Sequence, residues 1–243
     1  EHKTKKHDIQ AGLTYRIENI TEDSKEYEMR DSSGYSIPHT GEDLYMIYSL
    51  KAKNTLDANR LETYIQDTWR FSSKGEHTFF TLNYGIRFSH WNFNKESIIS
   101  PRISLGIVPA FNHDVTMRFA TGIYYQAPFY KELRDTTTIN GITYATLNNK
   151  IKSQRSIHFI AGFDYRFKMK DRPYKFTAEA YYKALSNLVP YTVDNVKIVY
   201  DASQQCSGHA MGLDLKLYGE FVPGTDSWVS LSLMNTRINI NGK

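Results

Sequence analysis

Histidine, cysteine and the carboxylate residues are the side chains of this sequence that could bind a metal ion or carry out acid–base chemistry. The eight histidines are His2, His7, His39, His77, His90, His113, His158 and His209, and they show no metal-ligand spacing. The single cysteine, Cys206, excludes a disulfide framework and a cysteine-rich zinc site within the chain. Motifs of serine hydrolases, zinc proteases and nucleotide-binding loops are also missing. We therefore expect no catalytic residue, no metal site and no cofactor.

The elements that must position any functional side chain are extended strands. From Ile9 to Glu18 the odd positions are apolar and the even positions are polar or glycine, a period of two that only a strand uses. The same alternation runs through Phe79–Ser89 and Val115–Gln126. Similar runs lie at about 98–108, 155–168, 174–184, 210–219 and 228–235, with a weaker one at 61–71. The pattern predicts an all-β fold of about nine strands, each of roughly nine to twelve residues, and no amphipathic helix.

The connections between the predicted strands alternate between long and short. Long loops are expected at about 19–60, 127–153 and 185–208, with a moderate one at 90–97. Short turns are expected at 72–76, 112–114, 170–173 and 223–226. This alternation predicts an antiparallel up-and-down meander with every long loop at one end, which is typical of transmembrane β-barrels, whose tilted strands cross a bilayer with ~9–11 residues. A soluble β-barrel or β-sandwich that binds a ligand is the alternative, because strand alternation fits both.

The two faces of the predicted strands differ in charge. Apart from Asp67, the apolar face carries almost no charge in the middle of its strands. A Lys or Arg that faces lipid at the bilayer centre costs ~2–4 kcal/mol, so this segregation is typical of a barrel wall with lipid outside. The polar face also carries six glycines, which would let an element filling the lumen approach the wall: Gly12, Gly85, Gly106, Gly122, Gly162 and Gly212. Aromatic residues near the short turns fit one interfacial girdle: Trp69, Phe71, Phe111, Tyr165, Phe167, Tyr174 and Phe221.

The overall composition excludes several other classes of protein. Thirty basic residues against 26 acidic ones give a net charge of +4, which is too mild to indicate a nucleic-acid partner. Aromatic residues make up 14% of the chain, so there is ample apolar surface to bury and the composition is not that of a disordered chain. No uncharged apolar run approaches the ~18 residues that a membrane-spanning helix needs.

Several short segments follow one another in an informative order: Tyr64–Trp69, Leu82–Phe88, Ser100–Ile103, Gly122–Pro128, Ala180–Lys183 with Asn187–Leu188, and Gly208–Leu217. Their order and spacing, over nearly the whole chain, resemble the middle of the β-barrel of TonB-dependent outer-membrane receptors. The resemblance implies an energised transporter in the outer membrane, with about 22 strands around a plugged lumen. It also implies that outer loops bind a nutrient such as a siderophore, a glycan or a peptide, and that a TonB complex in the inner membrane pulls on the plug.

The sequence departs from the complete family pattern. It has no TonB box, no plug domain and no terminal aromatic residue of the assembly signal. About nine strands cannot close a barrel of this class, in which about 22 strands are expected. We therefore expect residues 1–243 to be one partial β-barrel domain, a slice of a larger transmembrane barrel.

For ligand binding, the candidate residues are Trp91, Arg102, Tyr124 and Gln126, at upper-lumen positions that border the expected vestibule. A hydrogen bond to the plug or to a neighbouring strand is the alternative role of each. The long loops add aromatic and polar residues suited to carbohydrate, peptide or siderophore recognition, with packing as their alternative role. These are Tyr35, His39, Tyr45, Tyr48, Tyr130, Arg134, Tyr144, Asn148, Asn149, Tyr191, Tyr200 and Gln205.

An outer-membrane barrel hydrolase is the enzymatic alternative. Glu62, Asp67, His90 and His158 would have to supply its acid and base groups, but they come from different heights and faces of the predicted strands. We therefore predict a receptor barrel segment that is not an enzyme. Its expected partners are a small nutrient, outer-membrane lipid, and the plug and TonB complex, without nucleic acid.

Overall fold

The computed structural model describes residues 2–4, 6–30, 45–73, 75, 77–194 and 197–240. In chain order the elements are β1 (His2–Lys3), β2 (His7–Arg30), β3 (Tyr45–Ser72), β4 (Phe79–Trp91), β5 (Glu96–Val108), β6 (Val115–Gln126), the 3-10 helix η1 (Tyr130–Leu133), β7 (Arg134–Ile139), β8 (Ile142–Leu147), β9 (Gln154–Met169), β10 (Arg172–Leu188), β11 (Tyr191–Asp194), β12 (Lys197–Tyr200), β13 (Cys206–Val222) and β14 (Thr225–Asn239). In this part of the chain no helix has the length and apolar character needed to cross a membrane.

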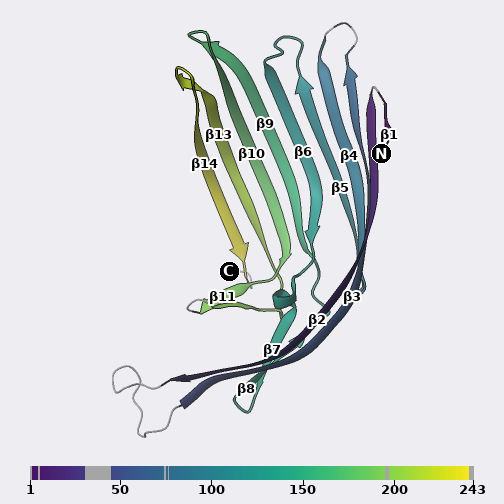
Figure 1. Ribbon diagram of the computed structural model, residues 1–243, viewed down its shortest axis with the longest axis vertical. Helices are drawn as coiled ribbons and strands as arrows, with labels where there is room; N and C mark the ends of the chain where they lie inside the picture. The colour runs from purple at the N-terminus through teal and green to yellow at the C-terminus, as the bar shows by residue number, and fades with distance from the viewer. Residues whose placement is uncertain are drawn as a thin grey trace.

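The sheet is an antiparallel meander (Figure 1). Its strand order is β1-β2-β3-β4-β5-β6-β9-β10-β13-β14, so neighbours in space are neighbours along the chain apart from small hairpins in the connections. Among the described residues nine strands are long, from 12 residues in β6 to 28 in β3, whereas β1 has two. This confirms the predicted all-β meander of about nine long strands.

The short turns lie at one end of the sheet and the long connections at the other, which we call the turn end and the loop end (Figure 1). The turn between β9 and β10 consists of Lys170 and Asp171, with φ angles of 52° and 60°. Positive φ at both central residues gives a two-residue turn the twist of its flanking strands. The turns predicted at 72–76, 112–114, 170–173 and 223–226 all connect adjacent strands.

The expected long loop over 19–60 is wrong for most of that range. β2 continues to Arg30 and β3 begins at Tyr45, so residues 19–30 pair with residues 45–57 as strands. These parts of β2 and β3 extend past the other strands and curve beneath the loop end in the view of Figure 1. Residues 19–30 are polar on both faces, so their sequence lacks the apolar alternation that marks a half-buried strand.

The two other long connections contain structure of their own. Residues 127–153 hold η1 and the hairpin β7–β8, and β8 pairs in parallel with β3 from Leu50 to Ala52. In the range expected as a loop over 185–208, β10 runs to Leu188, β11 and β12 form a hairpin, and β13 begins at Cys206. The connections are therefore folded onto the wall.

The sheet is one layer thick, with an apolar and a polar face. Opposed residues share a face, so Ile65, Ile86 and Pro101, which lie opposite one another on β3, β4 and β5, mark the apolar face. Large apolar side chains remain exposed there, including Leu13 (70%) and Leu231 (52%). A soluble sandwich would bury this face against a second sheet, and none covers it in the described part of the chain.

Buried apolar side chains concentrate at the loop end. One cluster joins residues of the wall to residues of the long connections: Leu56, Ala58, Trp91, Leu133, Ile151, Val189 and Ala202. A second, smaller cluster packs Leu50 and Ala52 of β3 against Ala145 of β8. We call the paired residues 19–30 and 45–57 of β2 and β3 the extended hairpin. Because burying apolar surface stabilises the contacts that exclude water, the long connections and the extended hairpin pack together, and we call this unit the loop module.

The aromatic residues predicted as a girdle form two runs of ring contacts at the turn end. One run comprises His7, Trp69, Phe71 and Phe80, and the other comprises Tyr165, Phe167, Tyr174 and Phe221, with neighbouring ring centres 4.5–5.6 Å apart. Phe111 lies outside both runs and is 78% exposed.

Candidate functional site

The strand register gathers arginines on the polar face toward the loop end. Arg60 of β3 lies opposite Trp91 of β4, which lies opposite Glu96 of β5. Arg87 shares the face of Trp91 on β4, and Arg102 shares the face of Glu96 on β5, because an even number of residues separates the members of each pair. Three adjacent strands therefore each project one arginine from the same face. We call Arg60, Arg87 and Arg102 the outer arginine group.

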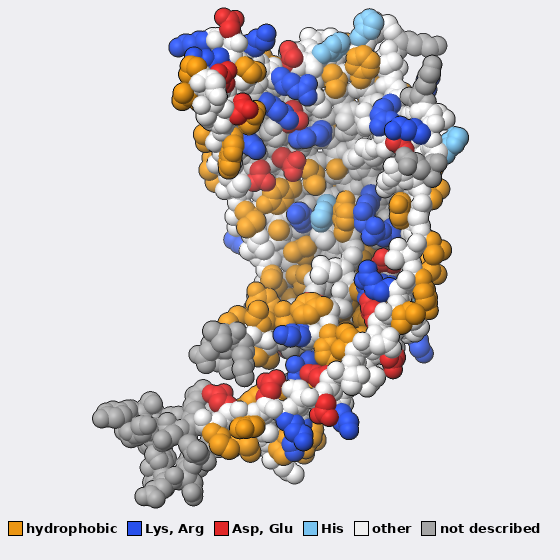
Figure 2. All heavy atoms as spheres, viewed as in Figure 1, with side chains coloured by type: hydrophobic (Ala, Val, Ile, Leu, Met, Phe, Trp, Pro, Cys, Tyr) orange, Lys and Arg blue, Asp and Glu red, His pale blue; other side chains and the backbone are white. Residues whose placement is uncertain are grey.

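Two adjoining hollows open on the polar face beside these arginines. The outer hollow, nearer the loop end, has a volume of about 340 Å³, and its lining includes Arg60, Glu62, Arg87, Ser89, Trp91, Glu96, Ser100, Arg102, Gln126 and Ser153. The middle hollow, of about 540 Å³, is lined in part by Tyr64, Arg87, Ser100, Arg102 and Tyr124. Both volumes fall in the range of roughly 300–1,000 Å³ that is usual for small-ligand sites. Figure 2 shows Lys and Arg side chains along this face, with Asp and Glu between them.

An aromatic stack holds Arg102 in place. Its guanidinium carbon lies 4.5 Å from the centre of the Tyr124 ring, which stacks on His158 at 4.3 Å. Gly122 lies opposite Arg102, and a Cβ there would be 3.2 Å from Arg102 Cγ and 3.1 Å from Tyr124 Cε2. The absence of a side chain at Gly122 therefore leaves the room in which Arg102 reaches Tyr124.

Other glycines of the polar face also make room for side chains of the wall itself. The Tyr64 ring covers Gly12, and the Tyr181 hydroxyl lies over Gly212. The sequence had indicated that these glycines let a lumen-filling element approach the sheet. In the structure, tyrosines from the adjacent strands occupy the space above Gly12 and Gly212. Packing within the wall itself therefore explains why these two positions lack a side chain.

Trp91 and Arg60 form the part of the outer hollow nearest the loops. The Arg60 guanidinium carbon lies 4.6 Å from the centre of the Trp91 ring, and its Nη2 lies 3.5 Å from Oε1 of Glu18. Trp91 is 4% exposed, yet its Nε1 and the Nε of Arg60 have no hydrogen-bond partner among the described residues. A buried donor without an acceptor costs about 1–3 kcal/mol. The outer hollow is therefore bordered by unused donors.

The four residues predicted from the sequence lie in one continuous region. Trp91, Arg102 and Gln126 line the outer hollow, and Tyr124 lines the middle hollow next to it. Sequence reasoning missed Arg60 and Arg87 as members of the site. The alternation placed Arg87 on the polar face, whereas Arg60 fell within the expected loop over 19–60. Only the register between strands shows that both lie beside Trp91 and Arg102.

Glu22 joins the extended hairpin to the connection after β6. Its Oε2 accepts a hydrogen bond from the Tyr130 hydroxyl at 2.6 Å and from Asn54 Nδ2 at 3.1 Å, and Arg134 Nη2 lies 3.5 Å from its Oε1. Burial, together with the hydrogen bond to Glu22 and the charge of that residue, raises the pKa of Tyr130 to about 12. Tyr130 and Arg134, which the sequence offered as ligand contacts, thus hold the loop module together.

Other residues of that predicted set are also engaged within the loop module. Asn148 Nδ2 donates to the Ala202 carbonyl at 2.9 Å, and Gln205 Nε2 donates to the carbonyls of Lys152 and Asn187 at 2.9 and 3.1 Å. These contacts favour packing over ligand recognition for Asn148 and Gln205. Tyr35, His39 and the side chain of Tyr45 lie outside the described residues.

At the turn end the polar face carries an ion-pair network. Asp164 is 7% exposed, lies 3.3 Å from Arg118 and 3.5 Å from Lys175, and accepts a hydrogen bond from Thr177 at 2.8 Å. Arg118 also lies 3.9 Å from Glu179. We call Arg118, Asp164, Lys175 and Glu179 the turn-side network, in which the cations have partners inside the wall.

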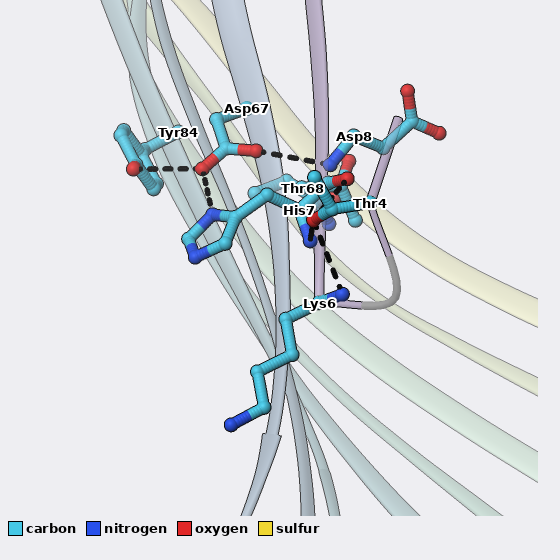
Figure 3. Close-up of polar contacts among 8 residues, drawn as sticks. Thr4, Lys6, His7, Asp8, Asp67, Thr68 and Tyr84 are labelled. Carbon is cyan, nitrogen blue, oxygen red and sulfur yellow. Dashed lines mark hydrogen bonds and ion pairs between the residues drawn. The ribbon is translucent and has the colours of Figure 1, made fainter. Parts of the chain in front are cut away.

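Asp67, the exception on the apolar face, is covered by its neighbours (Figure 3). Its Oδ2 accepts hydrogen bonds from His7 Nδ1 at 2.7 Å and from the Tyr84 hydroxyl at 2.9 Å, and its Oδ1 accepts one from the backbone N–H of Asp8 at 3.2 Å. Only 7% of Asp67 is exposed. Because a buried charge is tolerated where it is hydrogen-bonded, these contacts explain how an otherwise apolar face contains a carboxylate.

The residues that a hydrolase would need do not come together. His90 Nδ1 contacts Ser97 Oγ at 2.9 Å, His158 stacks on Tyr124, and Asp67 lies on the opposite face from Glu62. Within the described ranges, no group of three or more His, Cys, Asp or Glu residues is placed to hold a metal ion.

A one-layer meander with an exposed apolar face, a charged face and every long connection at one end is the wall of an outer-membrane β-barrel. Residues 3–242 match the family described as TonB dependent receptor-like, beta-barrel. The chain belongs to this family and forms a barrel portion of a TonB-dependent outer-membrane receptor. Proteins of the family are typically transporters.

A solved structure is similar over nearly the whole chain. The outer membrane transporter YddB from Escherichia coli matches with a TM-score of 0.60 and 15% sequence identity, over 96% of this chain and 31% of the transporter. At this identity the likeness concerns the fold alone. The matched region is 31% of the transporter, so the chain spans about a third of that protein's length. No match was found among curated protein sequences.

Proposed function

We propose that this chain is the ligand-facing wall of a transporter that takes up a small nutrient across the outer membrane and is not an enzyme. The nutrient is a siderophore, a glycan or a peptide. A plug domain fills the lumen, and a TonB complex supplies the energy by pulling on that plug. Family membership supports the transport mechanism.

The single observation that carries the ligand-binding role is the outer hollow. It has the volume of a small-ligand site, opens on the polar face, and lies between the wall and the loop module. Long loops of outer-membrane barrels are extracellular, so a nutrient arriving from outside would meet this hollow early on its path. Convergent polar groups in a concave site are the usual basis for orienting a ligand.

The proposal is tested with the full-length receptor in cells. Strains with and without the receptor are offered, one class at a time, iron chelates of siderophore type, oligosaccharides and oligopeptides, and accumulation of each is measured. We expect the receptor to raise the uptake of one class, and a protonophore to abolish that increase, because TonB-driven transport needs the proton gradient of the inner membrane. A small sugar that enters through general porins serves as the control.

Two outcomes would contradict the proposal. One is an uptake increase that persists in the presence of the protonophore, which would indicate passive diffusion through an open pore. The other is the same accumulation of all three classes with and without the receptor.

A further inference from the structure

The arginines of the outer hollow have unused hydrogen-bonding capacity. The Arg102 guanidinium carbon lies over the Tyr124 ring and that of Arg60 lies over the Trp91 ring, and Arg60 is also paired with Glu18. A guanidinium group carries its N–H donors at its edge, so stacking on a ring leaves them available. Arg87 is exposed, and no ion pair or hydrogen bond of its side chain occurs within the described part of the chain.

The acidic residues of the same hollow do not neutralise these arginines. Glu96 Oε2 accepts hydrogen bonds from the backbone N–H and the hydroxyl of Ser153, at 2.9 and 2.6 Å, and from Asn94 at 3.2 Å. Glu62 is the other carboxylate of the lining, and it lies opposite Ser89, two residues along β4 from Arg87. Arg60 is already paired with Glu18 at 3.5 Å, so Arg87 and Arg102 are the arginines of this lining that have no ion-pair partner within the described ranges, around a space of about 340 Å³.

Neutral donors line the same space. Ser89, Ser100 and Gln126 contribute to its walls, whereas the Ser153 hydroxyl is already donated to Glu96. The Nε1 of Trp91 and the Nε of Arg60, both without a partner among the described residues, are buried behind this lining and are not exposed to the space itself. Unpaired guanidinium groups beside neutral N–H and O–H donors are the chemistry that recognises an oxyanion, and arginine binds carboxylate and phosphate oxygens in pairs.

We infer that the outer hollow is a subsite for an oxyanion, a carboxylate or phosphate group of the transported nutrient, bound by Arg87 and Arg102 with Arg60 and Trp91 behind them. This inference rests on the proposed function and narrows its substrate class to anionic nutrients. The stack of Arg102 on Tyr124 and His158 fixes one guanidinium group before the ligand arrives, which lowers the entropy that binding must overcome.

The test uses the full-length receptor with its plug, purified in detergent at low ionic strength. Calorimetric titration measures binding of citrate as the carboxylate probe, inorganic phosphate as the phosphate probe and glucose as an uncharged control. We expect citrate or phosphate to bind and glucose not to bind, and the stronger of the two anions identifies the group that the site takes.

Variants locate the binding on these residues. Arg87→Gln and Arg102→Gln should each weaken binding of the preferred anion by about ten-fold or more, the usual effect of losing a charge-assisted hydrogen bond. Glu62→Gln should strengthen binding, because it removes the carboxylate that repels the anion. Arg118→Gln, an arginine of the same face in the turn-side network, is the matched control and should change binding less than two-fold, which is well under the ~1.4 kcal/mol that corresponds to ten-fold.

The inference is overturned if the wild-type receptor binds neither anion, or if Arg87→Gln and Arg102→Gln bind as tightly as the wild type. It is also overturned if Arg118→Gln weakens binding as much as they do, since the effect would then be one of general charge. These results are separate from the uptake test. A receptor that accumulates its nutrient but binds neither anion disproves only the subsite, whereas one that binds an anion without energised uptake contradicts only the transport proposal.

Discussion

The outer arginine group and the turn-side network lie on the same face of the same sheet and are built from the same kinds of residue, but their charges have different partners. In the turn-side network, Asp164 lies within 3.5 Å of both Arg118 and Lys175. At the loop end, Arg102 contacts an aromatic ring, and Arg87 has no ion-pair partner among the described residues. Arginines of the polar face are therefore of two kinds: some are paired with a carboxylate of the wall, and others have no such partner among the described residues.

The difference indicates which charges stabilise the wall and which are open to another molecule. A buried carboxylate with several donors depends on them, and removing one member leaves the others uncompensated. An exposed arginine without a partner adds little to stability, because its charge is already solvated. The turn-side network should therefore contribute to folding and Arg87 and Arg102 to binding, whereas Arg60 is held by Glu18. This division can be measured.

The largest effect is expected from Asp164→Ala. It leaves Arg118, Lys175 and Thr177 without their shared acceptor, and we expect the free energy of unfolding to fall by about 2–3 kcal/mol, the usual cost of losing hydrogen bonds to a charged group. Urea unfolding of the full-length receptor in detergent measures this change. The control is Asp214→Ala on the same face, opposite Glu179. Equal losses in the two variants would contradict a special role for the network.

A smaller effect is expected from Tyr130→Phe, which tests whether the loop end is held by its loops instead of by ion pairs on the wall. The variant removes the 2.6 Å hydrogen bond to Glu22, and we expect local stability to fall by about 1–1.5 kcal/mol. Faster proteolysis within residues 127–153 would report this loss. Tyr144→Phe, on the exposed side of β8, is the matched control. We call the Tyr130–Glu22 hydrogen bond the latch, and equal cleavage rates in both variants would contradict its stabilising role.

The same latch predicts a pH dependence at alkaline pH. Because the pKa of Tyr130 is raised from 10.0 to about 12 in the folded protein, its protonated form is favoured by folding. The contribution to stability is fully present below pH 10.0 and is lost as the pH rises to about 12. Titration of the tyrosinate absorbance should show one late-titrating group in the wild type that is missing from Tyr130→Phe. If the two titration curves coincide near pH 12, the latch does not exist in solution.

A still smaller effect is expected from Gly122→Ala, which sharpens the comparison at Arg102. The new Cβ would lie 3.2 Å from both Arg102 Cγ and the Pro101 carbonyl oxygen, so Arg102 must move away from Tyr124. We expect a loss of about 0.5–1 kcal/mol in stability, as for mild overpacking, with weaker citrate or phosphate binding. Gly106→Ala, on β5 with Arg102, is the control, because a Cβ at Gly106 would have its nearest neighbour 3.8 Å away. Unchanged anion binding in Gly122→Ala would show that the stack does not position Arg102.

The smallest effect on stability is expected from Arg87→Gln. Since this side chain has no partner in the described part of the chain, its loss should change the free energy of unfolding by less than about 0.5 kcal/mol. Arg118→Gln, measured in the same urea titration, should lose more because it leaves Asp164 with one cation fewer. If Arg87→Gln were the less stable variant, Arg87 would be a contact within the assembled receptor, and the division between binding and folding charges would fail.

The sequence by itself determined the class of fold and the two faces of the sheet. Alternation is a local property, since neighbouring residues of a strand point to opposite sides, so runs such as Phe79–Ser89 predicted both a strand and its polar side. The short turns were equally local. The strand through residues 19–30 was missed because it is polar on both sides and carries no apolar period. Residues 48–58 do alternate, with Leu50, Ala52 and Leu56 buried, and this local signal was overlooked.

The tertiary structure alone decided which polar residues act together. Trp91, Arg102, Tyr124 and Gln126 were chosen from their expected height, but Arg60 and Arg87 became part of the site only through the register of β3, β4 and β5. Register depends on pairing between segments far apart in the chain, and a shift by one residue would move each side chain to the other face. For the same reason no local pattern could show that Arg118 meets Asp164, 46 residues away, while Arg87 meets no such partner among the described residues.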